Sequence, residues 1–468
     1  MKRTRWLIRL LLLTPVAALA ENLDEPAERA ALPPSYKVLR FDEDYSCLSD
    51  PSKRTDYFDP IKYVPLRPGD PSWYLTIGGE LRERFEGMRN PDFGVEVPDD
   101  SYWLQRITLF ADLHLGQRVR VFTEGISGLI EGERPPAPPP QDDPIDLQFA
   151  FIDVVPYLNG NEALTLRLGR YGMSLGSGRL VATRASPNIP FKFDGVELLY
   201  QRPAWQVTAF LNRPVKENPD DFDSADKGIA FWGAYLTHGF SSSGKNGIDL
   251  YYLGIEREHG AYASVRGHEH RHSLGIRLFG QNEGWDWNGE AVGQFGRFGH
   301  DSILAWTASL DAGYTWTASY HPRLGLKIDV ASGDRNGSDD TQGTFDALFF
   351  KSGYFNDASL LRPANLIDIH PNLGASLTRS VFVNGGVDVF WRYTKDDAIY
   401  APPGFVTLPA LKNQSSYLGT AVDVNLQWQV QRHITVLASY VHFFTGSYVH
   451  ATRGGDVDYV STTLSFLF

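Results

Sequence analysis

The chain ends in VDYVSTTLSFLF, residues 457–468, and this stretch keeps a strict period of two. Val460, Thr462, Leu464, Phe466 and Phe468 alternate with Ser461, Thr463 and Ser465. Such alternation is typical of a β-strand with one apolar and one polar face. Because chain termini usually fray unless they are paired, this regular ending predicts a strand that closes a barrel. We expect its last residue, Phe468, to be read as an assembly signal.

The first twenty residues are typical of a secretory signal peptide. The stretch MKRTRWLIRLLLLTPVAALA combines four cations, an apolar run and the small-x-small site Ala18-Leu19-Ala20. This pattern predicts export, with cleavage before Glu21. The alternative is a membrane anchor, but the apolar run is too short to cross about 30 Å of hydrocarbon. No later stretch is apolar for about 18 residues, so no helical membrane span is expected.

Composition narrows the class of protein. Removal of the four cations in residues 1–20 changes the formal net charge from -12 to -16, which argues against nucleic acid as a partner. The single cysteine, Cys47, excludes an internal disulfide framework. Aromatic residues make up 13% of the chain and there are 44 glycines, without helical periodicity. These features favour an all-β protein.

Alternating segments recur from Trp73 to the end of the chain. In LAWTASLDAGYTW, residues 304–316, Leu310 lies on an apolar stripe that carries Trp306 and Trp316, and Ser309 lies on the polar stripe. A soluble β-sandwich also alternates. However, several runs reach 12 or more residues, whereas globular strands commonly have about 5–6. Long strands with charge-free apolar stripes favour a barrel in a membrane, with its polar face towards the lumen.

We therefore predict a transmembrane antiparallel β-barrel of about 18 strands over residues 73–468. The strands are expected near 74–87, 102–115, 118–128, 145–157, 163–171, 192–201, 204–213, 228–238, 247–258, 270–281, 285–298, 302–317, 322–332, 366–377, 381–394, 416–430, 433–446 and 457–468. Short connections such as 116–117 and 431–432 alternate with long ones such as 172–191 and 333–365. This alternation predicts short periplasmic turns and long outer loops.

Residues 21–72 do not share this pattern. They include five prolines from Pro51 to Pro71, which disfavour both a helix and a paired strand. We expect this leader to be a mobile periplasmic segment. The alternative is a segment that is tucked against or inside the pore.

Several segments resemble the alginate-export family of bacterial outer-membrane porins. The resemblance is carried by LTLRLGRYGMSLGSGRLVATRASPNIPFKFDGVELLY (164–200), GWDWNGEAVGQFG (284–296), DVFWRYT (388–394) and the leader with YLTIGGELRERFE (74–86). It implies a Gram-negative outer-membrane barrel of about eighteen strands, with an electropositive pore that passes an acidic polyuronate. By motif, Arg170 is similar to the arginine of the family's GRQ, and Arg392 to that of its FWR. Asp423 resembles a family acidic position.

Side chains on the polar faces of the strands are the candidate pore lining. They are Arg82, Arg84, Arg106, Arg118, Arg120, Arg167 and Arg392, with the acidic neighbours Glu80 and Asp388. Guanidinium groups pair with carboxylates, and rings of basic side chains select anions. The alternative is that these arginines only brace the wall through ion pairs. Arg170 has apolar parity, so it reaches the lumen only if a bulge at Gly169 turns it inward.

Other motifs give no catalytic or metal centre. RGHEHRHS, residues 266–273, places three imidazoles on one face, and SGDRNGSDDTQG, residues 332–343, groups three aspartates. We expect the first to be a solvated outer loop and the second a turn-rich loop, rather than metal sites. No hydrolase signature is recognised, so neither an enzyme nor a cofactor is expected.

The predicted function is an outer-membrane channel of the alginate-export type, for an anionic polysaccharide or anionic solutes. A general diffusion porin for small hydrophilic molecules is the alternative, and an adhesive barrel with a plugged lumen is a third possibility. The expected partners are outer-membrane lipid, the permeant and the outer-membrane assembly machinery.

Overall fold

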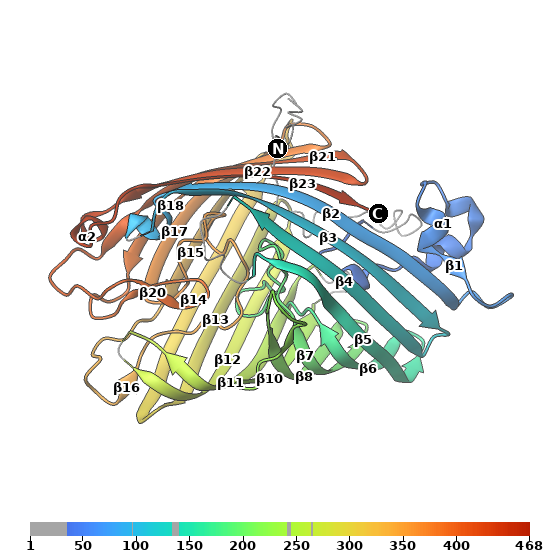
Figure 1. Ribbon diagram of the computed structural model, residues 1–468, viewed down its shortest axis with the longest axis horizontal. Helices are drawn as coiled ribbons and strands as arrows, with labels where there is room; N and C mark the ends of the chain where they lie inside the picture. Colours follow the sequence, from blue (N-terminus) through green and yellow to red (C-terminus); the bar gives the residue numbers. More distant parts are fainter. Residues whose placement is uncertain (1–34, 96, 133–139, 241–244, 264) are drawn as a thin grey trace, which may run out of the picture.

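In the computed structural model, eighteen long strands form one closed antiparallel barrel (Figure 1). The structure describes residues 35–95, 97–132, 140–240, 245–263 and 265–468, so the predicted signal peptide lies outside the described residues. The wall strands are β2 (Trp73–Arg89), β3 (Asp100–Leu115), β4 (Val119–Glu131), β5 (Asp143–Asn159), β6 (Glu162–Tyr171), β7 (Phe193–Arg202), β8 (Trp205–Lys216), β10 (Ile229–Gly239), β11 (Gly247–Ala261), β12 (Arg266–Asn282), β13 (Trp285–Phe298), β14 (Asp301–Thr315), β15 (Arg323–Ala331), β17 (Leu366–Ser376), β18 (Val381–Arg392), β21 (Tyr417–Gln431), β22 (Ile434–Thr445) and β23 (Val457–Leu467). The predicted barrel is confirmed.

The remaining elements are short. They are the strands β1 (Val64–Pro65), β9 (Ser224–Ala225), β16 (Thr341–Gln342), β19 (Ile399–Ala401) and β20 (Phe405–Leu408), the helices α1 (Asp59–Lys62) and α2 (Ser447–Ala451), and the 3-10 turns η2 (Arg40–Asp42), η3 (Ser46–Ser49), η4 (Pro51–Lys53) and η5 (Pro91–Gly94). Within the described part of the chain, no helix has the length and apolar character needed to cross a membrane.

The last strand closes the barrel against the first. Strand β23 pairs with β2, with Leu467 opposite Glu80, and the two strands lie side by side in Figure 1. The amide of Gly79 donates to the Phe468 carbonyl over 2.9 Å, and the Phe468 amide donates to the Gly79 carbonyl over 3.1 Å. Phe468 therefore forms the final rung of the seam. Its role as an assembly signal stays a prediction.

The alternating pattern sorts side chains between the outside and the lumen. On β14, Leu310 keeps 47% of its surface exposed, whereas Ser309 keeps 8%. The long apolar side chains on this outward parity face the lipid, because a charge at the midplane there costs about 2–4 kcal/mol. The polar parity faces an interior that is filled by loops.

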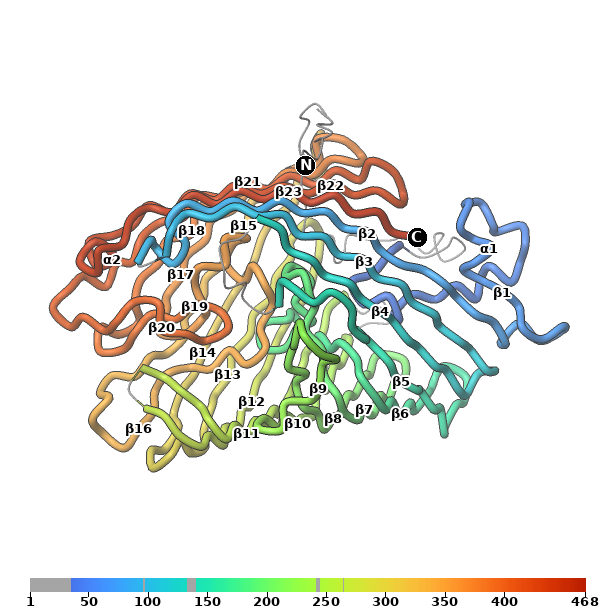
Figure 2. The backbone as a smooth tube through the Cα atoms, viewed as in Figure 1, coloured from blue at the N-terminus to red at the C-terminus, as the bar shows by residue number. Residues whose placement is uncertain are grey.

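Two long loops pack inside the barrel. The loop after β6 (172–192) meets the loop after β15 (332–365) through a parallel bridge between Val181 and Phe349. Phe349 packs on Phe193 and Phe231 of the wall. Figure 2 shows the orange loop after β15 running between the blue and yellow walls of the barrel. The lumen is thus a packed interior and not an open tube.

Candidate functional site

Five inward arginines form one arc of the barrel wall. They are Arg82 and Arg84 on β2, Arg106 on β3, Arg120 on β4 and Arg167 on β6, and we call this arc the basic wall. Strand pairing brings them together because period-two alternation keeps one parity inside; for example, Arg82 lies opposite Arg106, and both Arg120 and Arg167 lie opposite Asp153. The sequence placed all five on this parity.

Each arginine of the basic wall has acidic or carbonyl partners. Arg106 Nη2 lies 2.9 Å from Glu80, Arg120 Nη2 lies 2.7 Å from Asp112, and Arg167 Nε lies 2.8 Å from Asp153. The Arg84 Nε lies 2.6 Å from Glu86. These pairs are the bracing contacts that the sequence analysis held as an alternative to an anion path.

The loop 172–192 adds a second set of partners to the same arginines. Arg82 donates to the carbonyls of Ala185 (2.9 Å) and Pro187 (3.1 Å) and to Asn188 Oδ1 (3.2 Å). Arg106 also donates to the Ala185 carbonyl, over 3.2 Å. The loop carbonyls therefore occupy positions at which the oxygens of a carboxylate ligand would bind a guanidinium group.

Asn188 fixes this loop to the wall from the other side. Its side-chain amide donates to the carbonyls of Gln105 (3.0 Å), Leu129 (3.2 Å) and Gln141 (2.9 Å). The side chain is fully buried. Nothing in the local sequence pattern distinguishes Asn188, because its partners lie 47 to 83 residues away along the chain.

The described part of the leader is docked against the barrel. Phe41 is buried against Phe122, Phe149 and Phe151 of the inner wall, and its carbonyl accepts a hydrogen bond from Arg120 over 2.6 Å. These contacts favour the pore-associated alternative over a free periplasmic segment. The five prolines allow only short elements here, such as the four-residue α1 with Pro60 in its first turn.

Arg40 of the leader binds both sides of the closing seam. It donates to the carbonyl of Gly79 on β2 and to that of Phe468 after β23, both over 3.0 Å. Lys62 lies close by, with its ammonium group 5.1 Å from the Tyr45 ring and 5.8 Å from the Phe468 ring. The leader therefore contacts the seam as well as the lumen, which no sequence signal indicated.

The other three candidate arginines lie outside the basic wall. Arg118 is exposed in the turn between β3 and β4, where it donates to the Val155 carbonyl. Arg170 pairs with Asp194 over 2.7 Å and lies 3.7 Å from the buried Asp146, with only 11% of its side chain exposed, and Gly169 before it adopts a positive φ of 134°. Arg392 is buried at the outer end of β18, where it donates to the carbonyl of Ser415 over 2.6 Å. Arg392 holds the loop after its own strand.

A second arc of the wall is acidic, and we call it the acidic wall. Its members are Glu290 on β13, Asp329 on β15, Asp368 on β17, Asp388 on β18 and Asp423 on β21. Asp388 and Asp423 were candidates from the sequence, and parity places the other three on the same side. Arg179 of the loop 172–192 reaches this arc, with Nε 3.2 Å from Glu290 and a direct ion pair to Asp329.

The histidine motif has a different setting from the one expected. His268, His270 and His272 belong to β12, so the expected solvated loop is wrong there. The strand begins at Arg266, and His270 and His272 lie beside Trp232 and Phe295, respectively. The aspartate motif lies in a turn-rich loop, as expected. Within it, Asp334 is buried, and its amide donates to Asp397 over 2.9 Å.

One Gly-x-Ser-x-Gly spacing does occur, as GMSLG at residues 172–176. A hydrolase elbow places this serine on a sharp turn between a strand and a helix. Here β6 is followed by the loop 172–192, in which the structure describes no helix, and Ser174 Oγ accepts a hydrogen bond from the Thr183 amide. The spacing therefore gives no support for a hydrolase.

Comparison with known proteins agrees with the barrel. The family model described as alginate export matches residues 73–462. No curated protein sequence matches this chain. Among solved structures, Pseudomonas aeruginosa OccK8 (OprE) is similar with a TM-score of 0.57, 13% identity and coverage of 84% of this chain and 98% of that one.

Two further solved structures have the same fold. A BenF-like porin from Pseudomonas fluorescens Pf-5 has a TM-score of 0.58 and 8% identity, covering 84% of this chain and 99% of that one. P. aeruginosa OccK2 (OpdF), solved in complex with glucuronate, has a TM-score of 0.55 and 11% identity, covering 84% and 96%. At these identities the likeness concerns the fold.

Proposed function

Since the chain belongs to the alginate-export family of outer-membrane channels, we propose that it passes solutes that carry carboxylate groups, acidic sugars and their polymers above all. The basic wall is the observation that supports this. Five guanidinium groups on β2, β3, β4 and β6 offer planar, permanently charged donors that match carboxylate geometry. Basic side chains that line a pore favour anions.

In the proposed passage, the loop 172–192 gives way to the solute. The carbonyls of Ala185 and Pro187 now accept hydrogen bonds from Arg82. A carboxylate is a stronger acceptor than a neutral carbonyl, because a charge-assisted hydrogen bond is roughly twice as strong as a neutral one. An acidic sugar is therefore able to replace the loop at the basic wall, while most ion pairs that brace the wall remain in place.

The structural neighbour OccK2 was solved with a molecule of the proposed chemical class. Glucuronate, the molecule in that complex, is a single uronic acid with one carboxylate and several hydroxyl groups. Such a solute suits a lumen in which arginines alternate with acidic and amide side chains. Because only the fold is shared, the substrate is inferred from the charges of this chain and not from the neighbour.

The experiment is ion selectivity in a planar bilayer. We expect the reversal potential across a salt gradient to indicate a preference for anions, and glucuronate or an oligouronate to reduce the current. Arg106→Gln should weaken the block by uronate about tenfold, since one charge-assisted hydrogen bond contributes about 1.5–3 kcal/mol. Arg202→Gln is the matched control, because that arginine is exposed at the end of β7 on the lipid-facing parity of Val196 and Leu198.

The alternative function is a general diffusion porin for small hydrophilic molecules. Its supporting observation is that the basic wall already has partners, with Glu80 on Arg106 and Asp112 on Arg120. A wild-type channel that prefers cations, passes neutral sugars and uronates equally, and is unaffected by Arg106→Gln would establish this alternative and reject ours.

A further inference from the structure

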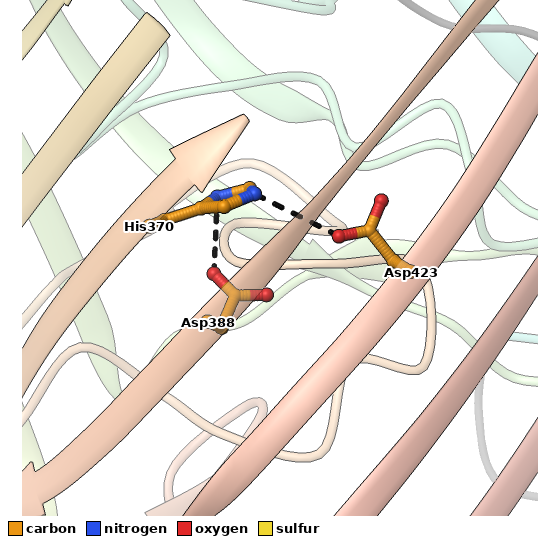
Figure 3. Close-up of side chains that lie close together, drawn as sticks. All are labelled: His370, Asp388 and Asp423. Carbon is orange, nitrogen blue, oxygen red and sulfur yellow. Dashed lines mark ion pairs between the residues drawn. The ribbon is translucent and has the colours of Figure 1, made fainter. Parts of the chain in front are cut away.

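The acidic wall contains three side chains that converge from three adjacent strands. His370 on β17, Asp388 on β18 and Asp423 on β21 point towards one another in the interior (Figure 3). His370 Nδ1 lies 3.0 Å from Asp388 Oδ1, and His370 Nε2 lies 3.7 Å from Asp423 Oδ1. One potential ligand atom from each residue lies within 4.8 Å of the other two. From this geometry we propose that the three residues bind a divalent transition-metal ion inside the channel.

The atoms that would bind the ion are the ones left without partners. His370 Nε2, Asp388 Oδ1 and Asp423 Oδ1 are buried and have no hydrogen-bond partner among the described residues. The two aspartates are more than nine-tenths buried. Buried polar atoms almost always have a partner, so these unpartnered atoms, in a group of residues with ligand spacing, indicate a missing ligand.

The opposite oxygen of each aspartate is held by an amide. Asn356 donates to Asp388 Oδ2 over 3.1 Å, and Asn425 donates to Asp423 Oδ2 over 2.6 Å. Such outer hydrogen bonds orient the ligands of metal sites. Each carboxylate is therefore fixed with its free oxygen towards His370.

The charge balance around the cluster also requires a cation. Asp368, on the same strand as His370, is fully buried, and neither of its oxygens has a hydrogen-bond partner in the described chain. It interacts electrostatically with Asp388. The nearby Lys327 lies 3.4 Å from Asp329 and donates to the Tyr354 carbonyl over 2.8 Å. Asp368, Asp388 and Asp423 therefore share Lys327 as a nearby cation, and a divalent ion at His370 would compensate the remaining negative charge.

The backbone leaves room for the imidazole at this point. Gly386 lies opposite Asp423 across the β18–β21 pair. A Cβ at Gly386 would collide with His370 Nε2. A glycine is therefore needed if the ring is to lie over β18 with this nitrogen free.

The donor set selects the kind of ion. Imidazole nitrogen favours Zn²⁺, Fe²⁺ or Ni²⁺ over Ca²⁺, and carboxylates also accept Mn²⁺. Bonds of about 2.0–2.2 Å bring ligand atoms to about 3.0–3.5 Å from one another, so small side-chain rotations close the site. A second group with ligand spacing, Asp143, Asp146 and Asp223, already has Lys192 Nζ 2.8 Å from Asp223 and makes a weaker candidate.

The test is Zn²⁺ titration of the folded, EDTA-treated protein in detergent, followed by calorimetry. We expect one Zn²⁺ per chain at this site, with Ca²⁺ bound at least tenfold more weakly. His370→Gln and Asp423→Asn should each weaken Zn²⁺ binding at least tenfold. His270→Gln is the matched control, because it breaks the row of imidazoles on the outer face and leaves the inner site intact.

A second measurement covers the case in which His370→Gln does not fold. Gly386→Ala keeps every ligand but crowds the imidazole, and the wild-type single-channel current should respond to micromolar Zn²⁺ while that of Gly386→Ala does not. Zn²⁺ bound equally by wild type and Asp423→Asn, or lost with His270→Gln alone, would overturn the proposal. So would a wild type that binds no Zn²⁺. The outcome is independent of which solute the channel passes.

Discussion

Replacing Asn188 by alanine should release the loop 172–192 from the basic wall. The asparagine donates three hydrogen bonds to backbone carbonyls and accepts one from Arg82. The asparagine NH₂ group has two N–H donors, so we count two neutral hydrogen bonds, which contribute about 1–3 kcal/mol at about 0.5–1.5 kcal/mol each. Because Arg82 keeps the carbonyls of Ala185 and Pro187, its bond to Asn188 adds little to this sum, and we take about 1–3 kcal/mol as the cost.

A change of this size has a measurable effect on the channel. Each 1.4 kcal/mol alters an equilibrium about tenfold, so the released form of the loop should become about 5 to 140 times more populated. In a planar bilayer, Asn188→Ala should spend more time in states of high conductance, and proteases added from outside should cleave the loop faster. The barrel should keep its heat-modifiable mobility, since no wall contact between strands is removed.

The control is Asn218→Ala, which alters an exposed asparagine in the outer loop after β8. It should change neither conductance nor cleavage. If Asn188→Ala conducts and is cleaved like the wild type, the loop is not held by this residue. The reasoning about the basic wall would then be wrong, because it takes the loop carbonyls as the ligands that an incoming carboxylate replaces.

Three more predictions concern the wall, the seam and the leader. Leu310→Arg should cost about 2–4 kcal/mol of stability because it places a charge on the lipid face. Ser309→Arg should mainly alter conductance. Equal destabilisation by both variants in urea titrations would contradict the assigned parity. Deletion of Phe468 removes the last rung of the seam and should lower outer-membrane insertion while secretion continues, as cell fractionation would report. Burial, together with the nearby Arg40, lowers the pKa of Lys62 to about 7. The unfolded leader therefore binds more protons between about pH 7 and pH 10.5, so docking should strengthen as pH rises through this range; hydrogen exchange should show this, and Lys62→Met should abolish it.

The wall of the barrel is readable from sequence because the signal is local. Side chains such as Ser309 and Leu310 report their face through the next residue along the strand, whichever strand lies beside them. The alternation up to Phe468 was equally informative, since such a regular pattern is typical of a strand that is paired with a neighbour. The strand pairing across the seam then follows from closure alone.

The filling of the barrel is not readable in the same way. Phe41 is a single aromatic residue in an irregular leader, and its partners on β4 and β5 lie more than 80 residues away. Asn188 and Arg179 lie in a loop without periodicity, where residue type alone does not indicate a partner. Their positions depend on the packing of loops that only the closed barrel brings together.

The candidate arginines show which features of the pore lining strand parity predicts and which it does not. It identified the five residues of the basic wall, but it also admitted Arg118, which lies in a turn, and Arg392, which holds a loop. Motif resemblance selected Arg170, which pairs with Asp194. Period-two alternation indicates which side of the wall a residue faces. It does not indicate which groups that side chain contacts.

The loop 172–192 joins the two arcs of opposite charge. It presents backbone carbonyls to Arg82 and Arg106 on one side, and the guanidinium group of Arg179 to Glu290 and Asp329 on the other. A carboxylate solute replaces only the first set of contacts, so the acidic wall continues to hold the loop through Arg179. Full displacement then requires a cation at the acidic wall as well, and the cluster around His370 is where the charges of that wall are least compensated. On this reasoning, the passage of acidic solutes and the occupancy of the acidic wall are coupled through one loop. Arg179→Gln should then ease uronate entry as strongly as Asn188→Ala. If Arg179→Gln responds to uronate like the wild type, solute passage and the acidic wall are not coupled.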